Sequence, residues 1–433
     1  MSYIREHVSI IAVGVISAFA YLYLALTTQN YEQPTLSAFL FVMLLCGLLS
    51  FALCGYYQKG GRQIPISLLL GFAVLFRLIA LWGLPIFEDD FYRYLWDGKL
   101  LVETGQPYGV APAAFFGSDG LTEKFEDILS QINHPNIATV YGPFCQWVFA
   151  VGYLIAPGEI WPLQLIFGLA DMAIVLMLLR MAKPNWVMLY AWSPLMIKEF
   201  AFTAHPDVLG VALLLGGFLL MKSNRWVFAA VLLALAAATK VFALILIPFL
   251  LGFRIRAWFV FGVTALLVAL PFGVLQAWKP EGLDAMATSW LFNAPIYLLL
   301  LQWFSFSTVK SVLLGTFVVF WALYLAREMY WERMTGSARK PFRPDVLFAV
   351  FFLCAPVLNA WYYVWLLPFA VIYPSMTAWV GSVALCLAYV SGINMLNSEL
   401  GLYEQPMMVL VIQFAVIAIA FIWDVWRRNK RQA

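Results

Sequence analysis

The sequence predicts an all-α protein, a polytopic transmembrane helical bundle with about 12–14 spans. Hydrophobic residues make up 64% of the 433 residues and charged residues only 11%, against roughly half and about a quarter in soluble proteins. Long apolar runs recur from residue 8 to residue 426, and Lys and Arg gather in alternate loops between them. A soluble fold could not bury so much apolar surface, so we expect one transmembrane domain over residues 1–433. The net charge of +3 and the lack of a large basic patch argue against nucleic-acid binding.

Fourteen apolar runs can span or half-span a membrane. They cover residues 8–27, 36–56, 66–84, 160–181, 186–202, 208–221, 226–239, 241–253, 257–275, 308–328, 346–358, 361–373, 376–395 and 407–426. Several are shorter than the roughly 20 residues of a straight span, so we expect broken or tilted helices whose ends line a cavity. The first run is too long for a signal-peptide core, and we expect it to be retained. Residues 141–156 are expected to be re-entrant or to lie along the outer interface, the alternative being a full span.

The charged residues predict the orientation of these spans. Most basic residues fall on one side, which the positive-inside rule identifies as the cytoplasm. They are Arg5, Lys59, Arg62, Arg180, Lys183, Lys222, Arg225, Arg254, Arg256, five residues in the loop 327–343 and four after residue 426. Both termini are therefore expected in the cytoplasm, and most Asp and Glu residues on the opposite face. We expect a multi-pass protein of the cytoplasmic (inner) membrane whose chemistry faces the periplasm or the cell exterior.

The outward loop over residues 85–140 carries the densest acidic cluster. Residues 87–98 read FEDDFYRYLWDG, and a helix over residues 91–103 would place Asp90, Arg93 and Asp97 along one stripe at the membrane surface. Neighbouring carboxylates near lipid repel one another, so at least one pKa should rise, which suits a general base for a hydroxyl. The alternative is that Asp89 or Asp90 caps the helix.

Three other features carry polar or aromatic groups at the predicted outer face. His205 and Asp207 open a span, either as structural residues or as an intramembrane functional pair. Lys240 lies where two half-helices meet, and can either snorkel to lipid headgroups or hold a phosphate. Trp361 and Tyr362 belong to an aromatic cluster at a helix break, either as part of an interfacial belt or as a wall for a sugar or prenyl chain.

Two ionisable residues inside the spans, Arg77 and Asp171, are expected to pair or to bond to backbone. The five cysteines show no metal-ligand spacing and no disulfide framework.

These residues resemble a known family, the GT-C-type integral-membrane glycosyltransferases, in particular the bacterial polyprenyl-phosphate-mannose-dependent mannosyltransferases. The resemblance begins with the acidic loop, Gly105-Gln106-Pro107-Tyr108 and Ala111-Pro112. It continues with Asn133-His134-Pro135, Tyr141-Gly142-Pro143, His205-Pro206-Asp207, Ala238-Thr239-Lys240 and Asn359-Ala360-Trp361-Tyr362-Tyr363. Gly142 departs from the pattern, because a second proline is common at that position.

The resemblance implies a GT-C fold and transfer of a hexose, with mannose favoured, from a polyprenyl-phosphate sugar to a hydroxyl of a lipid-linked or glycan acceptor. It implies inversion, with Asp90 as general base and Asp89 as second choice. A leaving phosphate needs fixed cations, and Arg93, Lys240, His205 and Lys198 are the outward candidates. The implied substrate-binding residues are Arg93, Tyr94, Asp97, His134, His205, Asp207, Lys240, Trp361 and Tyr362.

No cofactor is expected, although Asp89, Asp90 and Asp207 could hold a divalent metal. The expected partners are the lipid-phosphate sugar, the acceptor and membrane lipids, without nucleic acid. The competing function is a polytopic transporter or lipid flippase, which would show an internal repeat and ionisable residues near the midplane. We find neither in the sequence. A structural or receptor-like membrane protein would explain neither the acidic cluster nor the broken helices.

Overall fold

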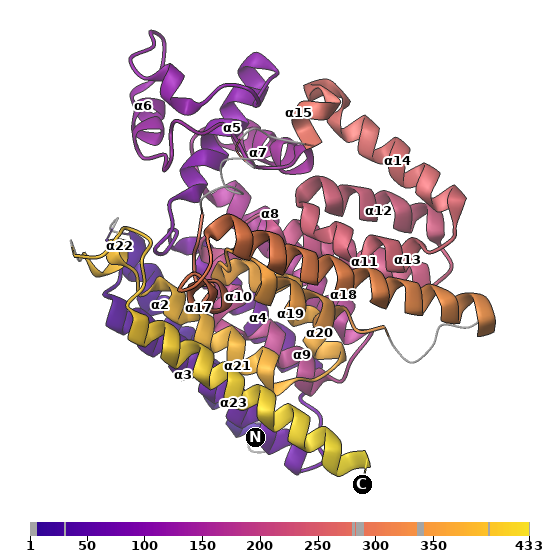
Figure 1. Cartoon of the computed structure of the whole chain (residues 1–433). Coiled ribbons are helices and arrows are strands. Elements are labelled where there is room, and N and C mark those ends of the chain that lie inside the picture. Colours follow the sequence, from indigo (N-terminus) through magenta and orange to yellow (C-terminus); the bar gives the residue numbers. More distant parts are fainter. Residues whose placement is uncertain are drawn as a thin grey trace. The chain divides into compact units, whose positions relative to one another are not determined.

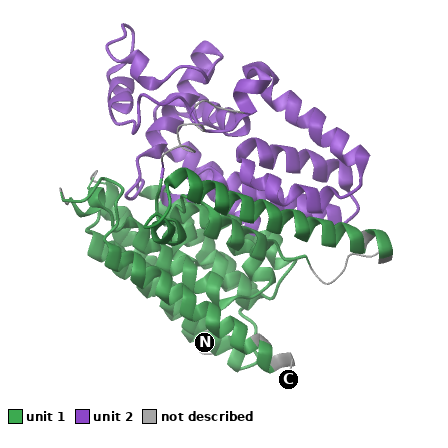
Figure 2. Cartoon of the chain, viewed as in Figure 1, with its two compact units in different colours: residues 1–83, 175–199, 291–433 green, residues 84–174, 200–290 purple. Residues whose placement is uncertain are grey.

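The computed structural model describes residues 7–29, 32–278, 282, 290–335, 342–396 and 399–432. Within these ranges every regular element is helical. Arg5 and parts of the predicted loops at 276–307, 327–343 and 397–406 lie outside the described residues. The chain divides into two units, coloured separately in Figure 2. Unit 1 comprises residues 1–83, 175–199 and 291–433, and unit 2 comprises residues 84–174 and 200–290.

Unit 1 holds the N-terminal and C-terminal helices, labelled in Figure 1. Its elements are α2 (Val8–Gln29), α3 (Leu36–Lys59), α4 (Ile66–Trp82), α9 (Pro184–Ala191), α10 (Pro194–Met196), α17 (Pro295–Leu300), α18 (Phe306–Thr335), α19 (Pro344–Cys354), η5 (Ala360–Trp365), α20 (Leu367–Ile372), α21 (Met376–Ala384), η6 (Leu385–Tyr389), α22 (Gly392–Met395) and α23 (Met407–Gln432). Helix α2 packs on α3 and α4, and α21 packs on α23. The Asp424 carboxylate of α23 accepts hydrogen bonds from the backbone N–H groups of Met376 and Thr377, and so caps the first turn of α21.

Unit 2 contains the whole of the predicted acidic loop. Its elements are α5 (Asp90–Thr104), η1 (Pro112–Phe115), α6 (Glu123–Ser130), α7 (Pro143–Ile155), α11 (Asp207–Lys222), α12 (Trp226–Thr239), η3 (Val241–Ile245), α13 (Ile247–Leu251), α14 (Ile255–Ala269), η4 (Leu270–Phe272) and α15 (Val274–Trp278). Helix α8 (Trp161–Leu179) and the π-helix η2 (Ile197–Phe202) each run across the boundary between the units. Helix α5 packs on α6 and α7, and α12 packs on α7, α11 and α14.

The expected polytopic helical bundle is confirmed. Fewer of its helices are long enough to span a membrane than the number of apolar runs indicates. Six helices within the described ranges are long and apolar enough to cross a membrane, or seven if the bent pair 194–202 and 207–222 forms one span. Five further apolar helices have only 10–17 residues. Proline starts two of these shorter helices, α7 and α19. Helix α7, at 13 residues, reaches about 20 Å at 1.5 Å per residue. That is less than the roughly 30 Å hydrocarbon core, and the expectation that residues 141–156 do not cross fully stays a prediction.

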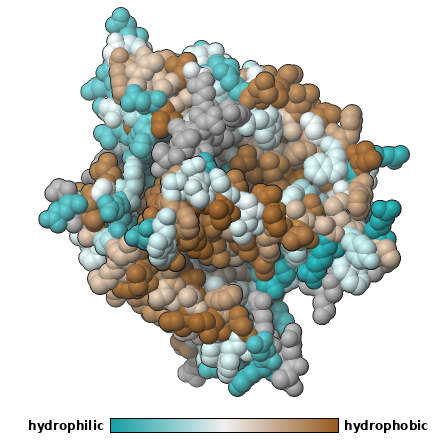
Figure 3. Space-filling model, in the orientation of Figure 1, coloured by the Kyte–Doolittle hydropathy of each residue, from teal (hydrophilic) through white to brown (hydrophobic). Residues whose placement is uncertain are grey.

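Three of the long helices expose so many apolar residues that they need lipid around them. Only 17% of the residues in the apolar windows of 255–272, α18 and α23 are buried inside the protein. On the face seen in Figure 3, hydrophobic side chains gather over α14 and α23, whereas hydrophilic ones gather around α6. Exposing so much apolar area to water would be unfavourable. The chain is therefore a multi-pass membrane protein.

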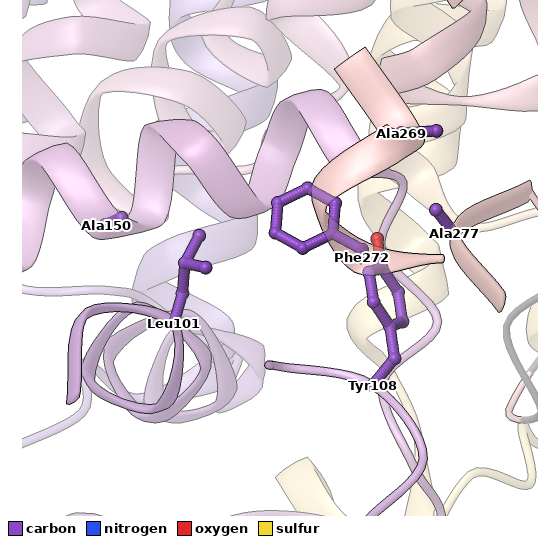
Figure 4. Packing of buried hydrophobic residues seen from close by; sticks show 6 residues of the cluster. All are labelled: Leu101, Tyr108, Ala150, Ala269, Phe272 and Ala277. Carbon is purple, nitrogen blue, oxygen red and sulfur yellow. The ribbon is translucent and has the colours of Figure 1, made fainter. Parts of the chain in front are cut away.

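A small apolar core holds the acidic loop of unit 2 in place. It joins α5, α7, α14, η4 and α15 through Leu101, Tyr108, Ala150, Ala269, Phe272 and Ala277. In Figure 4, Leu101 points toward α7 and the ring of Phe272 lies beside Tyr108. Tyr108 then donates a hydrogen bond of 2.9 Å to the carbonyl of Tyr141, which ties this core to the end of the loop.

Helix α5 is more deeply buried than an amphipathic surface helix should be. Residues 93–101 are all buried within the protein. Gly98 makes this possible, because a Cβ there would stand 2.4 Å from the carbonyl oxygen of Phe149 in α7. The stripe expected at the membrane surface is therefore buried within the protein at Arg93 and Asp97, where α5 packs on α6 and α7.

Candidate active site

The two acidic residues of the loop share one amide donor. The Nδ2 of Asn133 donates to Asp89 Oδ1 at 2.5 Å and to Asp90 Oδ1 at 3.0 Å. The hydroxyl of Tyr141 donates to Asp90 Oδ2 at 3.2 Å. Asp89 occupies the N-cap position of α5 but its side chain makes no capping hydrogen bond. The capping alternative therefore does not describe the Asp89 carboxylate, which faces its acidic neighbour and Asn133 instead.

The pKa of Asp89 is raised from its ordinary value of 3.8 to about 6. Burial is the main cause, because it disfavours the charged form, and the negative charge of Asp90 is the next. Hydrogen bonding to Asn133 opposes the shift. The expected rise of at least one pKa in this acidic cluster is confirmed at Asp89.

Arg93 and Asp97 of α5 bind the loop segment 134–139 through hydrogen bonds. Arg93 is 7% exposed, and its Nη2 donates to the carbonyls of Ile137 at 2.9 Å and His134 at 3.4 Å. Asp97 is 1% exposed and accepts hydrogen bonds from Thr139 Oγ1 at 2.5 Å and Gln146 Nε2 at 2.9 Å.

These contacts anchor the segment 134–139 to the buried side of α5. Burial raises the pKa of Asp97, while Arg93 and the two donors oppose that rise. Both side chains position the loop, and direct contact of either with substrate stays a prediction.

A second cluster joins the first residue of α11 to the residue that follows α12. Asp207 opens α11, and Lys240 follows α12 with an extended backbone. Lys240 Nζ lies 2.8 and 3.1 Å from the two Asp207 carboxylate oxygens. The Asp207 side chain is 4% exposed, whereas Lys240 keeps 24% of its side chain exposed. The pair therefore presents a partly open ammonium group beside a buried carboxylate.

Gly142 explains how the loop reaches Lys240. A Cβ at Gly142 would stand 2.2 Å from the carbonyl oxygen of Ala238 and 3.0 Å from that of Thr239. Only glycine allows the backbone to approach the last turn of α12 so closely. The residue that departs from the expected proline thus brings the start of α7 against the segment that carries Lys240.

Two tyrosines connect the acidic pair with His205. The rings of Tyr94 and Tyr141 pack edge to face, with their centroids 5.0 Å apart. The hydroxyl of Tyr94 lies 3.2 Å from His205 Nδ1. The site thus runs from Asp90 to His205 and on to Asp207, which follows two residues later.

Three residues beside this site have a left-handed backbone. Phe87, His134 and Ala204 have φ of 52°, 47° and 60°, a region that non-glycine residues seldom occupy. Each adjoins a site segment: Phe87 precedes the acidic cluster, His134 follows Asn133, and Ala204 precedes His205. Such strain costs about 1–3 kcal/mol per residue and concentrates at functional sites. The ring of His134 also packs against Trp290, with ring centroids 4.8 Å apart.

The remaining candidates belong to unit 1, and we describe them there. Trp361 and Tyr362 lie in η5, where Tyr362 is 7% exposed. Lys198 is fully buried, bonds to the hydroxyl of Tyr389 and lies 3.1 Å from Glu199 Oε2. Its ammonium group is therefore occupied within unit 1.

The two intramembrane residues are also buried. Arg77 donates to the carbonyls of Ala73 and Ala191, which confirms that it bonds to backbone. Asp171 is fully buried in α8.

In the sequence, Asn133 and Tyr141 are recognised only as parts of family motifs and have no predicted role. Both hold the carboxylates directly, and their separation of more than 40 residues from Asp90 hides that contact in the sequence. Among the described residues, no three His, Cys, Asp or Glu side chains gather closely enough to hold a metal ion. Asp89, Asp90 and Asp207 do not gather into one such group, and the use of a divalent metal stays a prediction.

A family model described as "Alpha-(1->6)-mannopyranosyltransferase, N-terminal domain" matches residues 8–256. The chain belongs to this family. The match covers the acidic loop, His205 and Lys240, and ends before Trp361 and Tyr362. Membership in this mannopyranosyltransferase family confirms the resemblance to GT-C mannosyltransferases, makes the chain a glycosyltransferase of mannose, and favours the enzyme over a transporter or flippase. Searches of curated proteins and of solved structures found no match.

Proposed function

We propose that the chain transfers mannose from a polyprenyl-phosphate mannose to a hydroxyl of a lipid-linked or glycan acceptor, with inversion at the anomeric carbon. The observation that carries this proposal is the Asp89–Asp90 pair, which Asn133 and Tyr141 hold in a loop of a mannosyltransferase-family membrane protein. The family description supports an α-1,6 linkage. An α product formed by inversion requires a β-linked donor.

Asp90 acts as the general base in this proposal, and Asp89 is the second choice. The Asp90 carboxylate is held by donors on both oxygens, Asn133 on Oδ1 and Tyr141 on Oδ2, which fixes its orientation toward an acceptor hydroxyl. Inversion needs one base opposite the leaving group, unlike hydrolases that use a carboxylate pair for two separate roles. Asp89, whose pKa lies near 6, sets the charge around that base.

The leaving phosphate gains negative charge, and a fixed cation nearby stabilises it. Lys240 supplies this cation, because its ammonium group is partly exposed and Asp207 holds it in place. His205 adds a second group that can become positive. Arg93 acts through the loop carbonyls that it binds, and we give Lys198 no part in phosphate binding.

The active site faces the periplasm or the cell exterior, in the cytoplasmic membrane, with both termini in the cytoplasm. The distribution of Lys and Arg supports this orientation. Single cysteines at Ser118, in the acidic loop, and Thr335, at the end of α18, should then react with membrane-impermeant reagents from opposite sides. Labelling of both from the same side would contradict the orientation without touching the chemistry.

The donor is tested with the purified protein and a panel of polyprenyl-phosphate sugars. A ligand that binds only the folded protein raises its melting temperature by mass action. We expect the mannose donor to give the largest rise, and Lys240→Met to lose most of it. Lys124→Met, which removes an exposed lysine of α6 paired with Glu159, is the matched control and should keep the rise. An equal rise with every sugar, or none with any, would contradict the proposed donor.

A further inference from the structure

The aromatic pair formed by His134 and Trp290 has no task in the proposed function. The two rings pack against each other at an angle of 47°, with their centroids 4.8 Å apart. Both residues are partly exposed. Trp290 lies outside residues 8–256, which the family model matches. Family membership therefore gives no role to this tryptophan.

The pair is joined to the acidic cluster through Asn133. The Asn133 amide donates to Asp89 Oδ1 at 2.5 Å and to Asp90 Oδ1 at 3.0 Å, and His134 is the next residue along the chain. Asp89, Asp90 and Asn133 are partly exposed, like the aromatic pair. The proposed base and the two rings therefore belong to one partly open region of unit 2.

Hydrogen bonds hold the backbone at His134 in place. Its φ of 47° is left-handed, and its carbonyl accepts hydrogen bonds from Arg93 Nη2 at 3.4 Å and from the N–H of Ile137 at 3.0 Å. The carbonyl of Pro135 accepts from the N–H of Ala113 at 2.8 Å. A surface that is ordered before its ligand arrives loses less conformational freedom on binding, so this segment is well prepared to bind a ligand.

Gly282 provides a second contact between the loop segment 134–140 and the part of unit 2 that contains Trp290. A Cβ at Gly282 would stand 2.6 Å from Val140 Cγ1 and still closer to the carbonyl oxygen of Ala138. Glycine is needed for such a close approach. Trp290 is therefore one of two residues that bring this later part of the chain against the loop beside the acidic pair.

A tryptophan beside a histidine offers the contacts that a sugar ring can use. The faces of a mannopyranose ring carry C–H bonds whose hydrogens are slightly positive. The face of an indole ring is negative, so it attracts such hydrogens while the contact also buries apolar surface. The imidazole nitrogens can donate to or accept from the hydroxyl groups of the sugar. The pair thus combines an apolar platform with a polar edge.

The place of the pair assigns it to the acceptor sugar. In the proposed function the attacking hydroxyl must reach Asp90, whereas the donor phosphate binds at Lys240. The pair follows directly on the residue that holds Asp90. We propose that Trp290, supported by His134, binds the pyranose ring of a glycan acceptor and places its hydroxyl at Asp90. This inference rests on the proposed function of Asp90.

Steady-state kinetics of the full-length protein in detergent, with an alkyl α-mannopyranoside as acceptor, test this assignment. Trp290→Leu removes the ring but keeps apolar bulk, and should raise the KM for the mannoside by about 10-fold without changing the KM for polyprenyl-phosphate mannose. Trp290→Phe keeps an aromatic face and should stay within about 3-fold of the wild type. The matched control is Trp258→Leu, at a partly exposed tryptophan of unit 2 whose indole N–H donates to the carbonyl of Gly252 at 3.0 Å. It should keep the wild-type KM for the mannoside.

The substrate whose KM changes decides the assignment. An unchanged KM for the mannoside, or a rise in the KM for the donor in its place, would overturn the acceptor site. If Trp290→Leu does not fold, His134→Asn removes the supporting ring while tolerating the left-handed backbone. It should raise the same KM, and a wild-type value would again overturn the proposal.

Asp90→Asn separates this inference from the proposed base. The mannoside should raise the melting temperature of Asp90→Asn by binding to the folded protein, and adding Trp290→Leu should remove most of that rise. Full transfer activity of Asp90→Asn would remove the proposed base. A rise in melting temperature that Trp290→Leu does not reduce would remove only the acceptor site.

Discussion

Replacing Asp89 with asparagine should stabilise the folded protein at alkaline pH and have no effect near pH 4. The pKa of Asp89 rises from 3.8 to about 6 on folding, and this difference corresponds to about 3 kcal/mol. The folded protein holds the Asp89 proton more tightly than the unfolded chain does. Its stability therefore falls as the pH rises from about 4 to about 6, and the full loss remains above pH 6.

Asparagine carries no charge and keeps an oxygen that can accept from Asn133, so Asp89→Asn escapes this loss. We expect the free energy of unfolding of the variant to exceed that of the wild type by up to about 3 kcal/mol at pH 8. The assay is thermal unfolding in detergent at a series of pH values from 4 to 8. Asp127→Asn, at an exposed carboxylate of α6, is the control. A variant that is less stable than the wild type at pH 8, or a difference independent of pH, would refute the reasoning.

Two further variants test the geometry around Lys240. Lys240→Met leaves the Asp207 carboxylate, 4% exposed, without its ammonium partner and should lower the free energy of unfolding by about 3 kcal/mol. Adding Asp207→Asn should restore stability in an unfolding assay but should not restore mannose transfer in an activity assay. A double variant as unstable as the single variant would contradict the pairing. Gly142→Ala places a methyl group 2.2 Å from the Ala238 carbonyl oxygen, so we expect about 1–3 kcal/mol of lost stability together with a lower kcat. An alanine variant with wild-type melting temperature and kcat would show that this close approach is unnecessary.

The sequence predicted the helical membrane fold and the acidic pair for the same reason. In a chain with so few charges, apolar runs and adjacent carboxylates both stand out from their surroundings. The predicted rise in the pKa of a carboxylate follows only in part from sequence, because Asp89 and Asp90 are neighbours in any fold but burial is the larger cause of the shift.

What surrounds the carboxylates depended on long-range packing. Asn133 and Tyr141 reach Asp90 only because Arg93 and Asp97 anchor the intervening loop and Gly98 lets α5 pack on α7. The same packing explains why the helical stripe predicted at the membrane surface is buried at Arg93 and Asp97. Periodicity gives one polar face of a helix, but it does not show that another helix covers that face.

The central claim is that Asp90 removes the proton from the acceptor hydroxyl. Its most direct test compares the initial rate of mannose transfer by wild type, Asp90→Asn and Asp89→Asn, each shown to be folded by its melting temperature. The account predicts that Asp90→Asn loses at least about 100-fold in kcat while retaining donor binding, and that Asp89→Asn keeps measurable transfer. Full activity of the folded Asp90→Asn variant would contradict it.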